Sequence, residues 1–148
     1  MSRMARFLKQ GVCYYVQSQG CADNNVFKRD EDYHRYLRLL KKYKQKFQIK
    51  VYGYCFLPEG VHLILYPDDA GQLSLFMKGL NQSYALYFNR TYQMSGKVWY
   101  QRYKSHVLND FCDLGECIKL IEFLPVKFRK SRAPMEYLWS SCRSRIVG

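Results

Sequence analysis

Several features that define other classes of protein are missing from this sequence. No two cysteines have the C-x-x-C spacing, which argues against a zinc ribbon. No stretch is apolar over the length needed to cross a bilayer, and the first residues lack the apolar core of a signal peptide. We therefore expect a reduced, cytoplasmic protein with no membrane partner. Several of its cysteines are expected to be buried thiols, from the set Cys13, Cys21, Cys55, Cys112, Cys117 and Cys142.

Acidic residues are also scarce. The chain has 12 Asp and Glu against 24 Lys and Arg, which gives a net charge of +12. Such a bias favours a polyanionic partner, most often nucleic acid and sometimes an anionic membrane surface, although a soluble basic protein without such a partner has the same composition. Hydrophobic residues make up 48% of the sequence, enough for a core, so disorder is not expected. The length fits a single domain spanning residues 1–148.

The stretch Val51–Tyr66 has the pattern of two strands joined by a tight turn. Both arms are rich in β-branched and aromatic residues, and the turn falls at Leu57-Pro58-Glu59-Gly60. Side chains alternate between the two faces of a strand. The second arm should therefore present Gly60, His62 and Ile64 on one face, and Val61, Leu63 and Leu65 on the other.

The remaining segments alternate between helical and extended patterns. Helices are predicted at about 30–47, 72–91 and 113–123, and strands at 12–20 and 98–108. The cations of the first helix are expected to face water, since charge runs usually do, with DNA contact as the alternative. Strands separated by helices, with one hairpin, predict an α+β fold. We expect a ferredoxin-like antiparallel sheet of four to five strands with helices packed on one face.

Short motifs along most of the chain match one known family. The hairpin compares with Y-x-x-M-P-N-H-V-H-L-L-L, and residues 73–89 compare with L-x-x-x-M-x-x-L-x-x-x-Y-x-x-x-F-N. Residues 96–105 compare with G-x-L-W-Q-x-R-Y/F-K-S, and residues 137–143 with Y-P-W-S-S-Y-R. The chain thus resembles the single-tyrosine, HUH-type transposases of bacterial insertion sequences, and is most similar to the REP-associated tyrosine transposases. The resemblance implies the ferredoxin-like fold, a homodimer and a single-stranded DNA hairpin as substrate.

The motifs that carry catalysis in that family are mostly absent. In the family, two histidines and a polar side chain hold Mg or Mn, and a tyrosine attacks the DNA phosphate. Here Gly60 replaces the first histidine and only His62 remains, while Leu120 and Leu124 fall at the positions of the tyrosine and the polar ligand. Leucine offers no nucleophilic oxygen, and one imidazole is too few for a catalytic metal. The site is therefore expected to be degenerate, with His62 a remnant and no metal or cofactor.

An active metal-dependent transposase with substituted residues is the alternative. Glu59 is the nearest acid, but it lies three residues from His62 and points to the opposite face of a regular strand. Tyr100 or Tyr103 could replace the nucleophile only if the in-line geometry were kept. Tyr15, at a position where the family has histidine, is a further departure.

The basic and aromatic stretch that ends at Ser105 is the best candidate for nucleic-acid contact. Cations, an amide and aromatic rings on one strand can meet phosphates and stack on unpaired bases. The alternative to a nucleic-acid contact is a half-buried strand whose cations simply extend into the solvent. A basic, aromatic sheet also suits single-stranded RNA, so an RNA-binding regulator stays open beside a protein that binds hairpin DNA. The residues assigned to nucleic-acid binding are Arg6, Tyr100, Gln101, Arg102, Tyr103 and Lys104.

Overall fold

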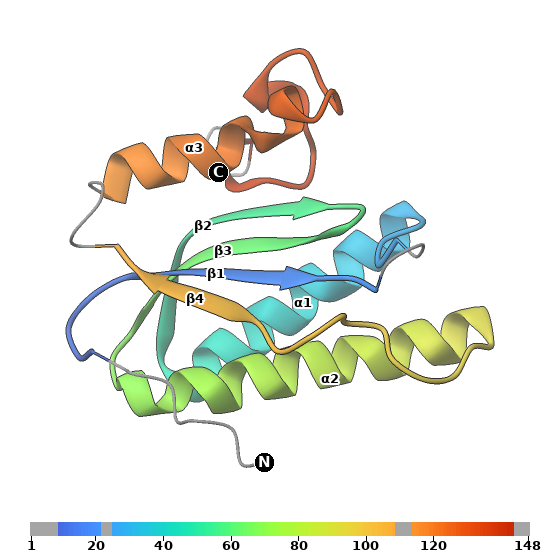
Figure 1. Ribbon diagram of the computed structural model, residues 1–148, viewed down its shortest axis with the longest axis horizontal. Coiled ribbons are helices and arrows are strands. Elements are labelled where there is room, and N and C mark those ends of the chain that lie inside the picture. Colours follow the sequence, from blue (N-terminus) through green and yellow to red (C-terminus); the bar gives the residue numbers. More distant parts are fainter. Residues whose placement is uncertain (1–8, 22–24, 109–113, 144–148) are drawn as a thin grey trace.

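The computed structural model describes residues 9–21, 25–108 and 114–143 (Figure 1). Four strands form one antiparallel sheet: β1 (Tyr14–Gln19), β2 (Ile49–Leu57), β3 (Gly60–Pro67) and β4 (Lys104–Val107). Their order across the sheet is β2-β3-β1-β4, so the first strand of the chain lies in the interior of the sheet.

Two long helices connect these strands. Helix α1 (Asp30–Phe47) joins β1 to β2, and α2 (Leu73–Tyr92), entered through the short helix η1 (Ala70–Gln72), joins β3 to β4. In each connection the two strands are separated by one strand of the sheet, as in a ferredoxin-like fold. The predicted α+β fold with an antiparallel sheet of four to five strands is therefore confirmed.

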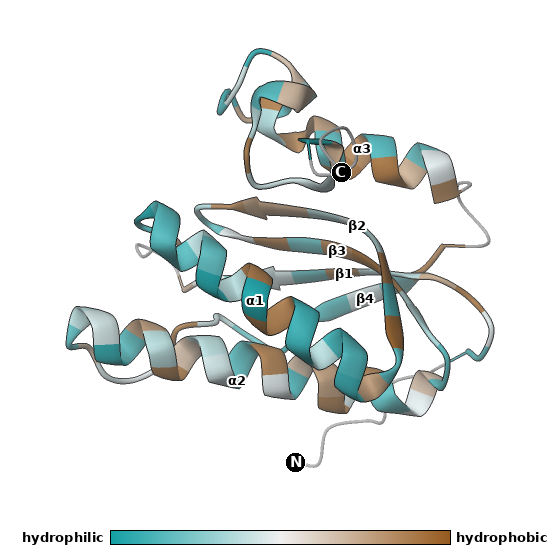
Figure 2. Ribbon diagram, turned by 180° about the vertical axis from the view of Figure 1, so that it is seen from behind, coloured by the Kyte–Doolittle hydropathy of each residue, from teal (hydrophilic) through white to brown (hydrophobic). Residues whose placement is uncertain are grey.

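Helices α1 and α2 lie together on one face of the sheet, as Figures 1 and 2 show. Leu63 and Leu65 of β3 point into this layer, as the alternation predicted, and are fully buried. The two helices bury apolar stripes against them, while the outer surface of α1 is largely hydrophilic (Figure 2). The helical part of this core comprises Tyr33, Tyr36, Leu40, Leu73, Phe76, Met77, Leu80, Tyr84 and Phe88.

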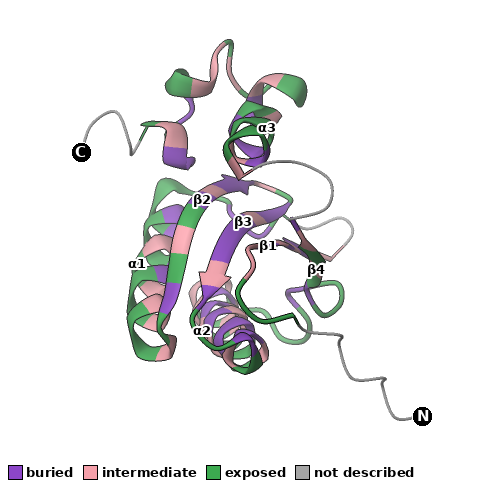
Figure 3. Ribbon diagram, turned by 90° about the vertical axis from the view of Figure 1, so that its left-hand side faces the viewer, coloured by how far each residue is buried: buried purple, intermediate pink, exposed green. Residues whose placement is uncertain are grey.

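Helix α3 (Leu114–Lys127) covers the other face of the sheet (Figure 3). Ile64, on the opposite side of β3 from Leu63 and Leu65, packs with Cys117 and Ile121 of α3. The prediction that helices pack on one face therefore holds for α1 and α2 but not for α3. The physical reason is that Ile64 of β3 and Cys55 and Leu57 of β2 lie on this second face, and these buried side chains need a covering layer.

The start of α1 is fixed by a buried carboxylate. Asp32 accepts hydrogen bonds from the backbone N–H groups of Lys28 at 2.9 Å and Arg29 at 3.1 Å, which have no partner within the helix. The hydroxyls of Tyr87 and Tyr92 on α2 donate to the same carboxylate at 2.7 and 2.5 Å. Asp32 thus caps one helix and joins it to the next.

The segment Tyr137–Ser141, here called the C-terminal strap, covers the outer edge of β2. The Phe56 N–H donates to the Trp139 carbonyl at 2.8 Å, and the Tyr137 hydroxyl donates to the Phe56 carbonyl at 2.5 Å. The Trp139 ring stacks on Tyr33 of α1 with centroids 4.7 Å apart. The strap therefore satisfies part of a sheet edge that would otherwise expose unpaired backbone groups. A short helix, η2 (Pro134–Glu136), leads into it.

Two predicted boundaries are wrong. The strand predicted at 98–108 is regular only over Lys104–Val107. Helix α3, predicted to end at Phe123, continues through Pro125 to Lys127. Proline in a helix removes one hydrogen bond, but Pro125 is buried within the last turn, and its carbonyl accepts from the Lys130 N–H. The predicted start of α3 at residue 113 lies outside the described residues.

Cysteine and membrane predictions have mixed outcomes. Over the described ranges, no helix is long and apolar enough to cross a bilayer. Cys55 is a buried free thiol, as expected, and burial raises its pKa. Cys117 is disulfide-bonded, which does not fit the expectation of reduced cysteines throughout. Cys112 lies outside the described residues.

Candidate nucleic-acid interface

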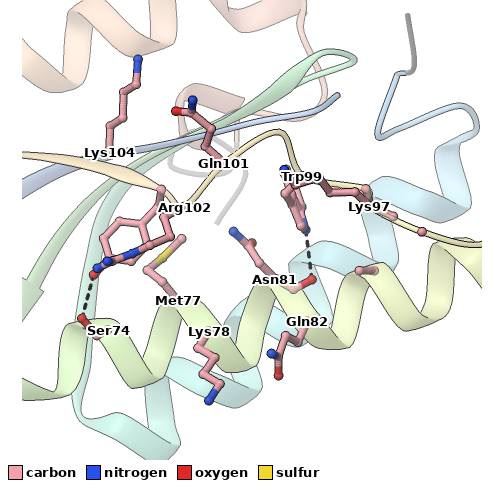
Figure 4. A pocket seen from close by; sticks show the side chains of 14 residues that line it. Ser74, Met77, Lys78, Asn81, Gln82, Lys97, Trp99, Gln101, Arg102 and Lys104 are labelled. Atoms are coloured by element: carbon pink, nitrogen blue, oxygen red, sulfur yellow. Dashed lines mark hydrogen bonds between the residues drawn. The ribbon is translucent and has the colours of Figure 1, made fainter. Parts of the chain in front are cut away.

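A pocket of about 1020 Å³ lies between α2 and the segment that leads into β4 (Figure 4). Four of the six residues assigned to nucleic-acid binding line it, whereas Tyr100 is not among the lining residues and Arg6 lies outside the described part of the chain. The complete lining is Ser74, Met77, Lys78, Asn81, Gln82, Ala85, Gly96, Lys97, Val98, Trp99, Gln101, Arg102, Tyr103 and Lys104.

The wall from α2 was missed by the sequence analysis. Ser74, Lys78, Asn81, Gln82 and Ala85 share one helical face, because they recur at intervals of three and four residues. This spacing was readable in the sequence as a polar stripe beside the apolar stripe. It identifies a face of α2 that is open to a partner, with Lys78 and Gln82 exposed.

The opposite wall is held against α2 by two aromatic side chains. The Trp99 indole N–H donates to the Asn81 carbonyl at 3.0 Å, and the Tyr103 hydroxyl lies 3.1 Å from Ser74 Oγ. Both rings are largely buried, with 9% and 8% of their residues' surface exposed. Residues 98–100 still hydrogen-bond to the end of β1, with an antiparallel bridge between Gly20 and Trp99, so only residues 101–103 leave the strand pairing before β4 begins. Because the Tyr103 ring is buried, it is not accessible for stacking on a base. Tyr100, which is 48% exposed, is the accessible aromatic side chain of this segment.

Asn81 fixes the position of α2 over the sheet. Its side-chain amide donates to Ser18 Oγ of β1 at 2.8 Å and accepts from the Tyr36 hydroxyl of α1 at 2.9 Å. Since both ends of the amide are used, Asn81 supports the pocket rather than offering groups to a ligand. The free amides of the lining are those of the exposed Gln82 and Gln101.

The charge around the pocket has one sign. Lys78, Lys97, Arg102 and Lys104 are exposed, and none of the fourteen lining residues is acidic. In Figure 4, Arg102 lies toward α2, whereas Lys104 extends away from it on the other side of the segment. Cations on both sides of one chain segment can meet successive phosphates of a bound strand. This arrangement suits a polyanion better than a neutral ligand.

His62 lies on the side of the sheet that α3 covers, and its surroundings are polar. Its Nδ1 is 2.7 Å from the Tyr15 hydroxyl of β1, and the Gln17 amide donates to the same hydroxyl at 2.8 Å. Burial lowers the pKa of His62 to about 4, so the imidazole is neutral near pH 7. Burial also raises the pKa of Tyr15, against the opposing effect of the Gln17 hydrogen bond.

Comparison with known proteins bears directly on this fold. The family described as transposase IS200 like matches residues 21–111, more than half of the chain. The protein belongs to the IS200-like transposase family. No curated protein sequence matches the chain.

Solved structures of transposases share the fold of this IS200-like protein. A REP-associated tyrosine transposase bound to a REP hairpin superposes with a TM-score of 0.80 at 16% identity, over 99% of this chain and 86% of that one. A candidate transposase from Deinococcus radiodurans R1 gives 0.54 at 14% identity, over 84% and 95%. The resemblance predicted from the sequence motifs is therefore confirmed, and so is the fold it implied.

The positions that the family motifs assigned to catalysis lie on β3 and on α3, the helix that covers this face of the sheet, and Cys55 and Leu57 pair with His62 and Gly60. Leu120 is 64% exposed on α3, whereas Leu124 is partly buried against Cys55 and Leu57. Gly60 is buried opposite Gln19 of β1. Within the described ranges, no group of three His, Cys, Asp or Glu side chains is placed to hold a metal ion.

Proposed function

We propose that this IS200-like protein binds single-stranded or hairpin DNA and does not cleave it. The observation that carries the proposal is the pocket between α2 and residues 96–104, with four exposed cations and no acid in its lining. Its support is threefold: the family membership, the net charge of +12, and the lack of nucleophilic oxygen at Leu120. The structural neighbour that is bound to a REP hairpin makes hairpin DNA the first ligand to test.

Arg102 and Lys104 are proposed as phosphate contacts, with Gln101 and Tyr100 beside them for a base edge or a base face. Lys78 and Lys97 extend the same cationic rim. Phosphate contacts position the strand without reading its sequence, so specificity is expected to come from the hairpin's shape and its unpaired bases.

The first test is equilibrium binding by fluorescence anisotropy. We would compare a DNA hairpin with single-stranded flanks, a linear single strand, a duplex and the matching RNA hairpin over a salt series. The proposal expects the DNA hairpin to bind most tightly at every salt concentration, with log affinity falling linearly with log salt. Equal binding of the RNA hairpin would favour an RNA-binding regulator instead. Weak and equal binding of all four nucleic acids would show that the interaction is non-specific and is due to the net charge alone.

A matched pair of double variants tests the pocket. We expect Arg102→Ala with Lys104→Ala to weaken hairpin binding at least tenfold, about 1.4 kcal/mol or more, and to lower the salt slope by roughly one per lost contact. The control is Arg38→Ala with Lys41→Ala, which removes the same two charges from exposed positions on α1. If both pairs weaken binding equally, total charge and not the pocket determines affinity.

The absence of cleavage is tested separately with labelled hairpin DNA and Mg²⁺ or Mn²⁺. No cut product and no covalent protein–DNA adduct are expected. An adduct mapped to a tyrosine, lost in His62→Ala, would establish the alternative of an active metal-dependent transposase with substituted residues.

A homodimer and a cytoplasmic location are also part of the proposal, and both rest on the family resemblance. Sedimentation velocity at several protein concentrations measures the first. A single species with the mass of one chain, 17.7 kDa, would contradict it.

A further inference from the structure

The α3-facing side of the β1–β3 pair carries a directed chain of hydrogen bonds. The Gln17 amide donates to the Tyr15 oxygen at 2.8 Å, and the phenolic hydrogen stays available to His62 Nδ1, 2.7 Å away. The rings of Tyr15 and His62 also face one another, with centroids 6.0 Å apart and planes inclined by 30°. When Nδ1 accepts this hydrogen bond, the neutral imidazole carries its proton on Nε2.

The same two strands are pressed together at Gly60. A Cβ atom on Gly60 would lie 2.6 Å from the Ser18 carbonyl oxygen and 3.2 Å from Gln19 Cα. Both neighbours are backbone atoms of a paired strand and cannot turn aside as a flexible side chain would. Glycine is therefore required by this backbone, and any larger residue at position 60 forces β1 and β3 apart.

The residues around His62 do not fit a divalent metal. Catalytic sites usually supply three protein ligands, and Mg²⁺ and Mn²⁺ prefer oxygen donors. Cys55, the neighbour of His62 on β2, offers a sulfur atom and not the oxygen that these ions prefer. Tyr15 and Gln17 carry no negative charge, and the Tyr15 hydroxyl is bonded to both Gln17 Nε2 and His62 Nδ1.

We infer that this face is a metal-free clamp between β1 and β3, in which Tyr15 is a positioning residue that holds His62 as the Nε2–H tautomer. A histidine restored at position 60 would not rebuild a metal site, because the strands leave no room for it. The inference deepens the proposed loss of cleavage, on which it rests, and is independent of whether DNA binds.

Long-range ¹H–¹⁵N correlation spectra of the histidine rings show which ring nitrogen of His62 carries the proton and so test the clamp. Wild type is expected to show His62 Nδ1 as the unprotonated and Nε2 as the protonated nitrogen at pH 7. Tyr15→Phe keeps the ring and removes the hydroxyl, so the Nδ1 resonance should shift or the two tautomers should mix. Tyr52→Phe, at a partly exposed position on β2, is the control and should leave His62 unchanged. A Nδ1–H tautomer in wild type, or no change in Tyr15→Phe, would overturn the clamp.

Metal binding is measured by the loss of the free Mn²⁺ signal in electron paramagnetic resonance with equimolar protein. Wild type and Gly60→His are expected to leave the signal unchanged, and Gly60→His should unfold at a lower temperature. Stoichiometric uptake by either protein, abolished by His62→Ala, would overturn the inference.

If Gly60→His does not fold, the wild-type titration and the Tyr15→Phe spectra still decide the question. Hairpin binding measured on the same wild-type preparation separates the two proposals. DNA binding together with Mn²⁺ uptake would overturn the clamp and leave the DNA-binding proposal standing, whereas the absence of both would overturn the DNA-binding proposal and leave the clamp standing.

Discussion

At the scale of single residues, Asp32 shows how one side chain organises its surroundings. Burial alone would raise its pKa, but the hydrogen bonds from Tyr92, Tyr87 and the N–H groups of Lys28 and Arg29 outweigh burial, and the pKa lies below the usual 3.8. A carboxylate whose pKa is lowered by folding stabilises the fold above its unfolded pKa. That stabilisation is lost as the pH falls through the lower, folded pKa.

Asp32→Asn should therefore destabilise the protein at pH 7 by about 1–3 kcal/mol, because an amide nitrogen would face groups that donate hydrogen bonds. The difference from wild type should persist down to about pH 4 and shrink below it. Urea unfolding at a series of pH values measures this. Asp30→Asn, exposed in the same helical turn, is the control and should cost only a few tenths of a kcal/mol. A constant difference at all pH values would contradict the role of the ionised carboxylate.

Two buried glycines on neighbouring strands make a second residue-scale comparison. Gly60→Ala should cost about 1–3 kcal/mol, since its Cβ would meet the Ser18 carbonyl at 2.6 Å. Gly53→Ala should cost clearly less, because its Cβ would make ordinary contacts of 3.4 Å with Ile118 and Ile121. Thermal unfolding of both variants measures which substitution costs more stability. Equal costs would show that β1 and β3 can move apart at Gly60 with little loss of stability.

At the scale of elements, the C-terminal strap stabilises the edge of β2. Tyr137→Phe should lower the free energy of unfolding by about 1–3 kcal/mol, because the buried Phe56 carbonyl loses the hydroxyl that donates to it. Leu138→Ala, in the same segment but 51% exposed, should change it by less than about 0.5 kcal/mol. Chemical denaturation of the two variants distinguishes a specific edge contact from a general effect of the segment.

The elements also show what the sequence could and could not predict. Helix α1 runs from Asp30 to Phe47 as predicted, because acids at its start, lysines near its end and a clear apolar stripe agree with one another. Residues 98–103 were predicted as strand because they are aromatic and β-prone. Residues 98–100 do pair with the end of β1, but the strand is interrupted at residues 101–103, where the Tyr103 hydroxyl meets Ser74 of α2, a contact that a local pattern cannot reveal. The position of α3 could not be predicted either, because the apolar residues that it covers, Ile64, Cys55 and Leu57, come from two different strands.

The candidate site was predicted only in part, because local sequence patterns do not reveal tertiary contacts. Its segment from Gln101 to Lys104 was recognised from local composition and family motifs. Its other wall depends on which face of α2 meets that segment, which is a tertiary fact. The contact of Tyr15 with His62 joins residues 47 positions apart and could be predicted only from the pairing of β1 with β3.

At the scale of the whole molecule, the net charge of +12 has a cost for the folded state. Like charges held on a compact surface repel one another, and salt screens them over about 10 Å at 0.1 M. The melting temperature should therefore rise as sodium chloride increases from low to moderate concentration, while DNA affinity falls. Differential scanning calorimetry of the free protein measures the melting temperature at each salt concentration. A melting temperature that does not change with salt would show that the cations lie too far apart to repel one another strongly.

The interior position of β1 has a consequence for how the chain is made. Its neighbours are β3 on one side and β4 on the other, and Tyr14 pairs with Val107. The β2–β3 hairpin is local and can form as soon as it leaves the ribosome, whereas β1, which ends at Gln19, must wait for β4, which begins at Lys104. The first strand to emerge is thus the last to be enclosed, and a nascent chain stalled before β4 would carry one edge of β1 open to other chains.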